Sequence, residues 1–176
     1  MDRAPRMTAE DARTAATFDA LMRAASEPGR IWPLPGSDPA LIAEALLDRE
    51  VSVHAADPDL AMRIALLGAL AADQEAADYV FAPALADLAS RLKAGTLADP
   101  DLGATLIAPA VFGRGTSLRL TGPGIALARD IAVDGIAPAF WAARAAALRY
   151  PRGFDIFLHD GASVIGLPRS TLIEVF

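Results

Sequence analysis

The sequence contains no cysteine. This absence excludes disulfide bonds, thiolate nucleophiles, iron–sulfur clusters and the usual cysteine-based zinc frameworks. Lysine and histidine are also scarce, because the chain has one lysine, Lys93, and two histidines, His54 and His159. Any chemistry at this chain must therefore use oxygen and nitrogen groups.

Long hydrophobic runs are missing as well. The longest apolar run, Leu60–Ala72, contains Arg63 and is shorter than the roughly 20 residues that a membrane-spanning helix needs. Residues Met1–Glu10 lack the apolar segment of a secretory signal. Alanine accounts for much of the hydrophobic fraction of 53%. We therefore expect a cytoplasmic protein that has no membrane partner.

Positive charge is in deficit, with 16 basic against 22 acidic residues and a net charge of −6. A negative chain repels the phosphate backbone, so nucleic acid is not an expected partner. The length of 176 residues lies within the roughly 100–200 residues of a typical domain. We expect a single domain over residues 1–176.

Capping residues, prolines and apolar spacing predict the secondary structure. Helices are expected over residues 8–27, 39–47, 58–70, 83–93 and 137–149. Extended segments or strands are expected at 31–34, 51–54, 79–81, 105–107, 118–120, 154–159, 164–167 and 171–175. The alternation of helices and strands, followed by a hairpin around Asp160-Gly161, predicts an α/β fold. We expect a three-layer α/β sandwich, with a mixed sheet covered by helices.

Two segments carry polar or glycine-rich patterns that could form a site. Leu120–Ile125 leaves a predicted strand through a glycine-rich turn, and a structural role is favoured over phosphate binding because Pro123 lacks an N–H donor. Asp155 and His159 share one face of the strand at 154–159. An edge hairpin with a solvated face is the favoured interpretation, and a carboxylate–imidazole acid–base pair is the alternative.

Arginines are the best candidates for anion binding. Arg152 and Arg169 could each hold a phosphate or phosphonate through bidentate hydrogen bonds, and interface ion pairs are an equally good explanation. His54 lies beside Ser52 on a predicted strand, and a metal site there would depend heavily on carboxylates because the other histidine is His159. No metal site is predicted.

The helix at 137–149 is the candidate interface. Trp141 lies on a stripe at helical spacing and is flanked by Arg144 and Arg149. Core packing is the ordinary explanation for such a stripe. A docking face for another subunit is the alternative, because tryptophan and arginine are enriched among interface anchors.

Five segments, taken in order, resemble the PhnH family of the bacterial carbon–phosphorus lyase system. They are Phe18–Met22 leading to Glu27–Gly29, Leu46–Ser52, Leu120–Ile125, Tyr150–Asp155 and Leu167–Thr171. Each segment alone is a common turn or helix end, whereas the ordered set is specific. The resemblance extends from about Phe18 to the C-terminus.

The resemblance implies a fold similar to that of pyridoxal-phosphate-dependent transferases, without the cofactor. It also implies a subunit that acts with the G, I and L subunits to replace the adenine of ATP with methylphosphonate, giving α-D-ribose 1-methylphosphonate 5-triphosphate. The G, I and J subunits are the implied partners in a core complex, and a separate subunit cleaves the carbon–phosphorus bond. No catalytic residue is carried over to this sequence.

Three hypotheses remain open from the sequence. The first is an interaction subunit without catalytic residues, cofactor or metal of its own, which forms a homodimer when isolated. The second is a stand-alone enzyme that acts on a phosphonate or phosphate near Arg152, His159 and Arg169. The third is a degenerate pyridoxal enzyme in which Lys93 holds the cofactor, although its predicted place at a helix end suits a structural role.

Overall fold

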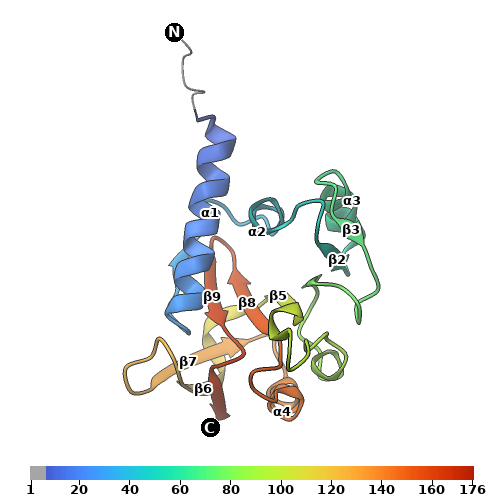
Figure 1. Cartoon of the computed structure of the whole chain (residues 1–176). Coiled ribbons are helices and arrows are strands. Elements are labelled where there is room, and N and C mark those ends of the chain that lie inside the picture. Colours follow the sequence, from blue (N-terminus) through green and yellow to red (C-terminus); the bar gives the residue numbers. More distant parts are fainter. Residues whose placement is uncertain (1–6) are drawn as a thin grey trace.

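The structure is a computed structural model that describes residues 7–176 (Figure 1). The first six residues of the segment Met1–Glu10, on which the expectation about a signal depends, lie outside the described part. Within residues 7–176, the helices are too short or too polar to span a bilayer.

A seven-stranded sheet forms the centre of the fold. Its strands, in spatial order, are β1 (Trp32–Pro33), β9 (Ser163–Leu167), β8 (Asp155–Asp160), β5 (Thr105–Pro109), β4 (Tyr79–Phe81), β2 (Ser52–Ala55) and β3 (Leu70–Ala71). The strands from β3 to β8 pair in parallel, whereas β8 with β9 and β9 with β1 pair antiparallel. The prediction of an α/β fold with a mixed sheet is confirmed.

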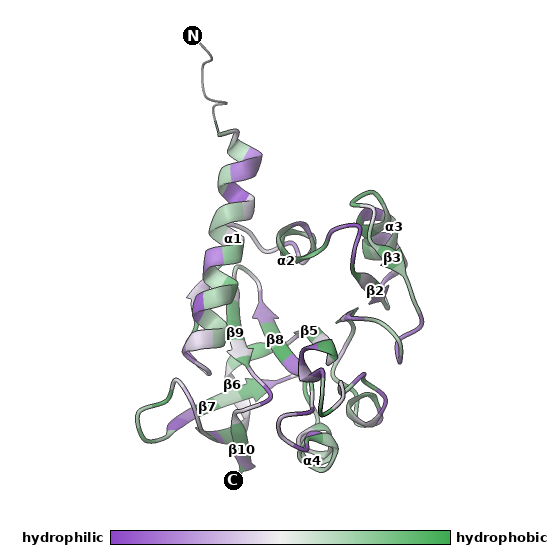
Figure 2. Ribbon diagram, in the orientation of Figure 1, coloured by the Kyte–Doolittle hydropathy of each residue, from purple (hydrophilic) through white to green (hydrophobic). Residues whose placement is uncertain are grey.

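Helices cover one face of this sheet. They are α1 (Ala9–Ser26), α2 (Ala40–Leu46) and α3 (Pro58–Ala65). Apolar side chains of the helices pack against those of the strands, including Phe81, Ile107 and Phe157. In Figure 2 the strand β9 is largely hydrophobic and β8 is hydrophobic in its middle, whereas α1 carries hydrophilic residues along its length. The period-2 pattern of the strands thus points one set of side chains toward the helices.

A second sheet, rather than further helices alone, covers the opposite face. It has the strand order β10 (Leu172–Val175), β6 (Val111–Thr121) and β7 (Arg129–Asp134), all antiparallel. Helix α4 (Pro138–Ala147) contacts β10. The larger core cluster lies here, where Ile156 and Leu158 of β8 meet Leu118, Leu120 and Phe140. The expectation of helices on both faces was therefore only partly right.

Two predicted helices are wrong in extent. The helix expected over 58–70 ends at Ala65, since Gly68 takes a φ of +87° and the chain turns into β3. The helix expected over 83–93 is reduced to the 3-10 turn η1 (Leu88–Ser90). There the carbonyls of Lys93 and Ala94 accept from the N–H groups of Ala104 and Gly153, so tertiary hydrogen bonds replace the last helical turn. A second 3-10 turn, η2, spans Pro100–Leu102.

The two glycines around Arg114 lie inside a strand. The strands expected at 105–107 and 118–120 are separated by the glycine-rich segment Gly113–Gly115, which suggests a turn, but this segment lies inside β6 as an irregularity where the register with β7 shifts between Phe112 and Thr116. Both glycines have positive φ, of +82° and +86°, which suits a bulge. The hairpin β8–β9 is as predicted, with Gly161 at φ +52° in its tight turn.

Helix α1 is the best-predicted helix and packs closely on β9. The helix expected over residues 8–27 begins at a capping box formed by Thr8 and Asp11, and it ends at Ser26, just before Pro28-Gly29. Gly166 of β9 lies directly against the backbone of Ala24 in α1. A Cβ atom at position 166 would collide with the carbonyl group of Ala24. The carbonyl of Gly166 also accepts from the N–H of Gly29 at 3.1 Å.

We expect Gly166→Ala to lower the free energy of unfolding by about 1–3 kcal/mol, because the added Cβ would force the backbone of α1 away from the sheet. Gly36→Ala is the matched control, since its Cβ would meet only the flexible end of Leu41. Chemical denaturation of the two variants and the wild type measures the effect. Equal stability of Gly166→Ala and Gly36→Ala would contradict this packing.

Candidate functional site

Residues 168–171 connect β9 of the central sheet to β10 of the second sheet, and we call them the crossing segment. An ion pair between Asp155 and Arg169 holds this segment. Asp155, the first residue of β8, accepts from the backbone N–H of Arg169 at 2.7 Å and from its guanidinium, with Nη2 to Oδ2 at 2.5 Å. The other terminal nitrogen of Arg169 donates to the carbonyl of Pro100. Arg169 is thus engaged within the chain, and binding a phosphate would require it to exchange these contacts.

Arg144 holds the same segment from the side of α4. Its Nη1 donates to the carbonyl of Thr171 at 3.2 Å, and its Nη2 donates to the carbonyl of Pro168 at 2.9 Å. The residue is only 2% exposed, and burial lowers its pKa to about 10, with the charge of Asp155 acting in the opposite direction. Arg144 therefore keeps its positive charge at neutral pH.

Trp141 lies inside the fold next to Arg144. It is 3% exposed, and its ring contacts Phe140 edge-to-face at a centroid distance of 5.3 Å. Arg149 is exposed instead, and its Nη1 donates to the carbonyl of Leu148 at 2.7 Å. Of the three interface candidates, only Arg149 therefore presents its side chain on the open surface.

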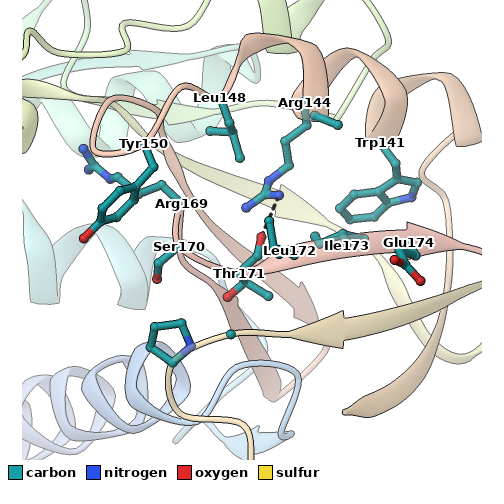
Figure 3. A pocket seen from close by; sticks show the side chains of 13 residues that line it. Trp141, Arg144, Leu148, Tyr150, Arg169, Ser170, Thr171, Leu172, Ile173 and Glu174 are labelled. Atoms are coloured by element: carbon teal, nitrogen blue, oxygen red, sulfur yellow. Dashed lines mark hydrogen bonds between the residues drawn. The ribbon is translucent and has the colours of Figure 1, made fainter. Parts of the chain in front are cut away.

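A groove of about 630 Å³ runs along the seam between α4 and β10 (Figure 3). We call it the α4–β10 groove and define it by the lining residues Gly122, Trp141, Arg144, Leu148, Arg169 and Leu172. In Figure 3, Trp141, Arg144 and Leu148 reach down from the helix toward Thr171–Ile173 of the strand side. The groove thus brings together one anion candidate, two interface candidates and the glycine-rich turn.

That turn is structural, as the sequence favoured. Ile125 N–H donates to the Gly122 carbonyl at 3.1 Å, and Gly124 takes a φ of +81°. A side chain at Gly124 would collide with the carbonyl of Ser26, so the turn approaches the end of α1 too closely for any other residue.

The other anion candidates are not gathered with Arg169. Arg152 is exposed in the turn before β8, at the same end of that strand as Arg169. His159 lies at the opposite end of β8, where burial lowers its pKa and the charge of Asp160 opposes the shift. Asp155 and His159 are four residues apart along the strand, which is about 13 Å. The structure therefore does not form the carboxylate–imidazole pair.

The interpretation that the sequence favoured for this strand is also wrong. An edge hairpin with a solvated face was expected, but β8 lies between β5 and β9 within the sheet. Phe157, on the face shared with Asp155 and His159, is 7% exposed and packs beneath the helices. The alternation itself was right, since Phe154, Ile156 and Leu158 all enter the other core.

Lys93 forms a structural ion pair. Its Nζ donates to Asp78 Oδ1 at 2.6 Å, while Asp78 Oδ2 accepts from the backbone N–H and the hydroxyl of Ser52 at 2.9 and 2.6 Å. Lys93 does not end an α-helix, so the predicted helix-dipole contact is wrong. Within residues 7–176, no cluster of three or more histidines and carboxylates could hold a metal, and this includes the surroundings of His54.

The burial of Arg144 is the feature that sequence reasoning missed. Trp141 and Arg144 are three residues apart on α4, so they share one helical face, and this spacing was the available signal. Nothing local indicated that the face packs against Thr171, because that contact joins residues 27 positions apart in the chain.

Comparison with known proteins gives a consistent result. The family model described as "Bacterial phosphonate metabolism protein (PhnH)" matches residues 6–174. A protein of Stutzerimonas stutzeri, described as "Putative C-P lyase subunit protein HtxG", is 36% identical over 169 residues. The alignment covers 93% of this chain and 87% of that protein.

The Asp78 cluster makes stability depend on pH. Desolvation raises the pKa of Asp78, but hydrogen bonds from Lys93 and Ser52 outweigh it and hold the pKa below the ordinary value of 3.8. A lowered folded-state pKa stabilises the fold above the unfolded-state pKa, and this contribution is lost as the pH falls through the folded-state pKa.

We therefore expect Asp78→Asn to be less stable than the wild type at pH 7 and to approach it as the pH falls below 3.8. Urea denaturation at several pH values measures the difference. Asp101→Asn, which changes an exposed carboxylate, is the control and should show little effect at any pH. A difference for Asp78→Asn that stays constant with pH would disprove the role of its charge.

Proposed function

The chain belongs to the PhnH family of bacterial phosphonate metabolism proteins, and from this premise we propose that it is a partner-dependent subunit of a carbon–phosphorus lyase assembly. The relative from Stutzerimonas stutzeri, named as a putative subunit of such a lyase, supports the proposal. We propose that the subunit supports the synthesis of α-D-ribose 1-methylphosphonate 5-triphosphate from ATP and methylphosphonate, in the cytoplasm. Its proposed partners are the G, I and J subunits, and the L subunit is linked to it in function.

One observation carries the proposal of a docking subunit. Tyr150 and Leu172, which line the α4–β10 groove, stay exposed, and so do Val175 and Phe176, which lie at and after the end of β10; we call these four residues the C-terminal apolar surface. Tyr150 is 78% and Leu172 67% exposed. Aromatic and aliphatic side chains that gather in this way are typical of protein–protein interfaces. We propose that the partner subunit covers this surface.

The alternative of a stand-alone enzyme has weaker support. It requires Arg152, His159 and Arg169 to act together, but His159 is at the far end of β8 from the two arginines. Arg169 is also bound to Asp155 and to a main-chain carbonyl. These contacts favour a role of Arg169 in holding the crossing segment.

We further propose that the chain is a single domain with the fold of pyridoxal-phosphate-dependent transferases, without the cofactor. The ion pair of Lys93 with Asp78 supports the absence of a Schiff base, because a protonated lysine is not a nucleophile. We also propose that the isolated chain forms a homodimer, in which two copies of the C-terminal apolar surface cover each other.

Leu172→Asp should weaken capture of the chain by co-expressed G, I and J subunits about tenfold or more, because it places a charge in a desolvated contact. Co-purification from cells that express all the subunits measures the capture. Leu66→Asp is the matched control, since Leu66 is 87% exposed and follows α3, which lies far from β10 in Figure 2.

Both variants should fold, because both leucines are exposed. Capture of Leu172→Asp at the wild-type level would show that the partner binds elsewhere. Failure of the wild type to co-purify would contradict the proposal that the chain is a subunit of this assembly. Light scattering of the isolated chain should give a dimer for the wild type and for Leu66→Asp, and a monomer for Leu172→Asp.

Incubation with pyridoxal phosphate should give no Schiff-base absorbance beyond that of an ordinary surface lysine, because Asp78 holds the Lys93 ammonium. Arg149→Lys, which adds one exposed lysine, provides the reference level. A strong band in the wild type that disappears in Lys93→Ala would revive the pyridoxal hypothesis.

A further inference from the structure

A separate pocket, of about 390 Å³, lies at the amino ends of the parallel strands, where α1 and α2 meet the central sheet. We call it the amino-end pocket and define it by six of its lining residues: Met22, Leu46, Tyr79, Thr105, Asp155 and Phe157. Within residues 7–176 it shares no lining residue with the α4–β10 groove. Its volume lies within the range of roughly 300–1,000 Å³ that is typical of small-molecule sites.

A row of three polar side chains forms one side of the pocket. Tyr79, Thr105 and Asp155 are the first residues of β4, β5 and β8. The register of these parallel strands pairs Tyr79 with Thr105 and Thr105 with Asp155. Paired residues of neighbouring strands point to the same face of a sheet, and the strands lie about 4.8 Å apart. The row therefore presents two hydroxyls and a carboxylate over about 10 Å.

This polar row carries hydrogen-bonding groups but no unbalanced charge. Burial raises the pKa of Tyr79, and the charges of Asp78 and Asp48 act in the same direction, so the hydroxyl stays protonated and can donate. Within residues 7–176, neither the Tyr79 hydroxyl nor the Thr105 hydroxyl has a hydrogen-bond partner. Asp155 is the charged member of the row, and Arg169 neutralises it. An occupant is therefore expected to be uncharged and to offer at least one acceptor.

The other walls of the amino-end pocket are apolar and partly aromatic. Phe157 is 7% exposed and lies two residues after Asp155, on the same face of β8. Met22 of α1 and Leu46 of α2 line the pocket from the helices. Aromatic rings and the methionine sulfur both make favourable contacts with an aromatic ligand. The walls thus suit an aromatic ring whose polar edge meets the row.

We propose that the amino-end pocket binds an uncharged aromatic nitrogen heterocycle of the nucleobase class, with its polar edge on Tyr79 and Thr105 and its ring against Phe157. Proteins that hold a single base combine hydrogen bonds to its edge with aromatic or apolar contacts to its faces. An anion is not expected here, since no basic side chain lines the pocket within residues 7–176. The choice of adenine as the probe rests on the proposed function, in which the adenine of ATP is replaced.

The two tyrosines of the chain provide an internal comparison. Tyr79 lines the amino-end pocket, whereas Tyr150 lines the α4–β10 groove. In the full chain with ¹³C-labelled tyrosine, adenine should shift the ring signals of Tyr79 in a saturable way and leave those of Tyr150 in place. Tyr79→Phe and Tyr150→Phe assign the two sets of signals.

Removal of each hydroxyl tests the polar row while the shape of the pocket is kept. Tyr79→Phe and Thr105→Val should each weaken adenine binding roughly three- to tenfold, because each loses one hydrogen bond. Indene has a similar fused-ring frame without nitrogen, so it should bind both variants as it binds the wild type. Tyr150→Phe is the matched control and should leave the affinity for adenine unchanged. Ligand-observed NMR titrations measure these affinities.

The proposal is overturned if adenine leaves the Tyr79 signals in place, if the Tyr150 signals move instead, or if both variants bind adenine like the wild type. Equal weakening of adenine and indene in the variants would overturn it as well. Absence of adenine binding in a chain that the G, I and J subunits still capture would overturn the pocket alone. Adenine binding by a chain that these subunits do not capture would overturn the subunit role alone.

Discussion

The crossing of the chain from the central sheet to the second sheet depends on two guanidinium groups. Residues 168–171 leave β9 and enter β10, and regular sheet pairing is interrupted there. Arg169 fixes the crossing to Asp155 at the start of β8, and Arg144 fixes it to α4 through the carbonyls of Pro168 and Thr171. Without Arg144, the carbonyl of Thr171 would lose this donor, whereas the carbonyl of Pro168 would keep only the N–H of Thr171. The position of β10, and therefore of the α4–β10 groove, follows from this pair of arginines.

The two arginines differ in how their charges are balanced. Arg169 has a carboxylate partner, so its charge is neutralised inside the chain. Arg144 has only carbonyl dipoles, and its surroundings are dry enough to lower its pKa. The same contacts that build the seam thus leave a positive charge beneath an apolar groove.

Local signals in the sequence predicted the regular elements well. The Thr8 capping box, the prolines at the starts of α2 and α3 and the glycine of the β8–β9 turn each act within a few residues, so their outcomes could be stated in advance. The failures involve contacts between distant segments. Residues 83–93 have helical spacing, but the carbonyls of Lys93 and of the following Ala94 accept from the N–H groups of Ala104 and Gly153. Likewise, the place of β8 inside the sheet depends on β5, which lies about fifty residues earlier.

The candidate site was predictable only in part for the same reason. Family resemblance indicated the biological system, and helical spacing placed Trp141 and Arg144 on one face. The sequence could not show that this face is buried against residues 168–173, nor that Arg169 would be bound by Asp155. Whether an arginine is free, paired or buried without a counter-charge depends on tertiary contacts, and these decide its function.

The location of the groove is also unusual for an α/β fold. Ligands of such folds commonly bind beyond the carboxyl ends of the parallel strands. Here the chain itself covers part of that edge, because Ala110 N–H donates to the carbonyl of His159 and Phe112 N–H donates to the carboxylate of Asp160 at 2.9 and 2.8 Å. The start of β6 therefore lies across the end of β8. The concave surface with an unbalanced charge lies instead along the seam with the second sheet, at the opposite end of β8.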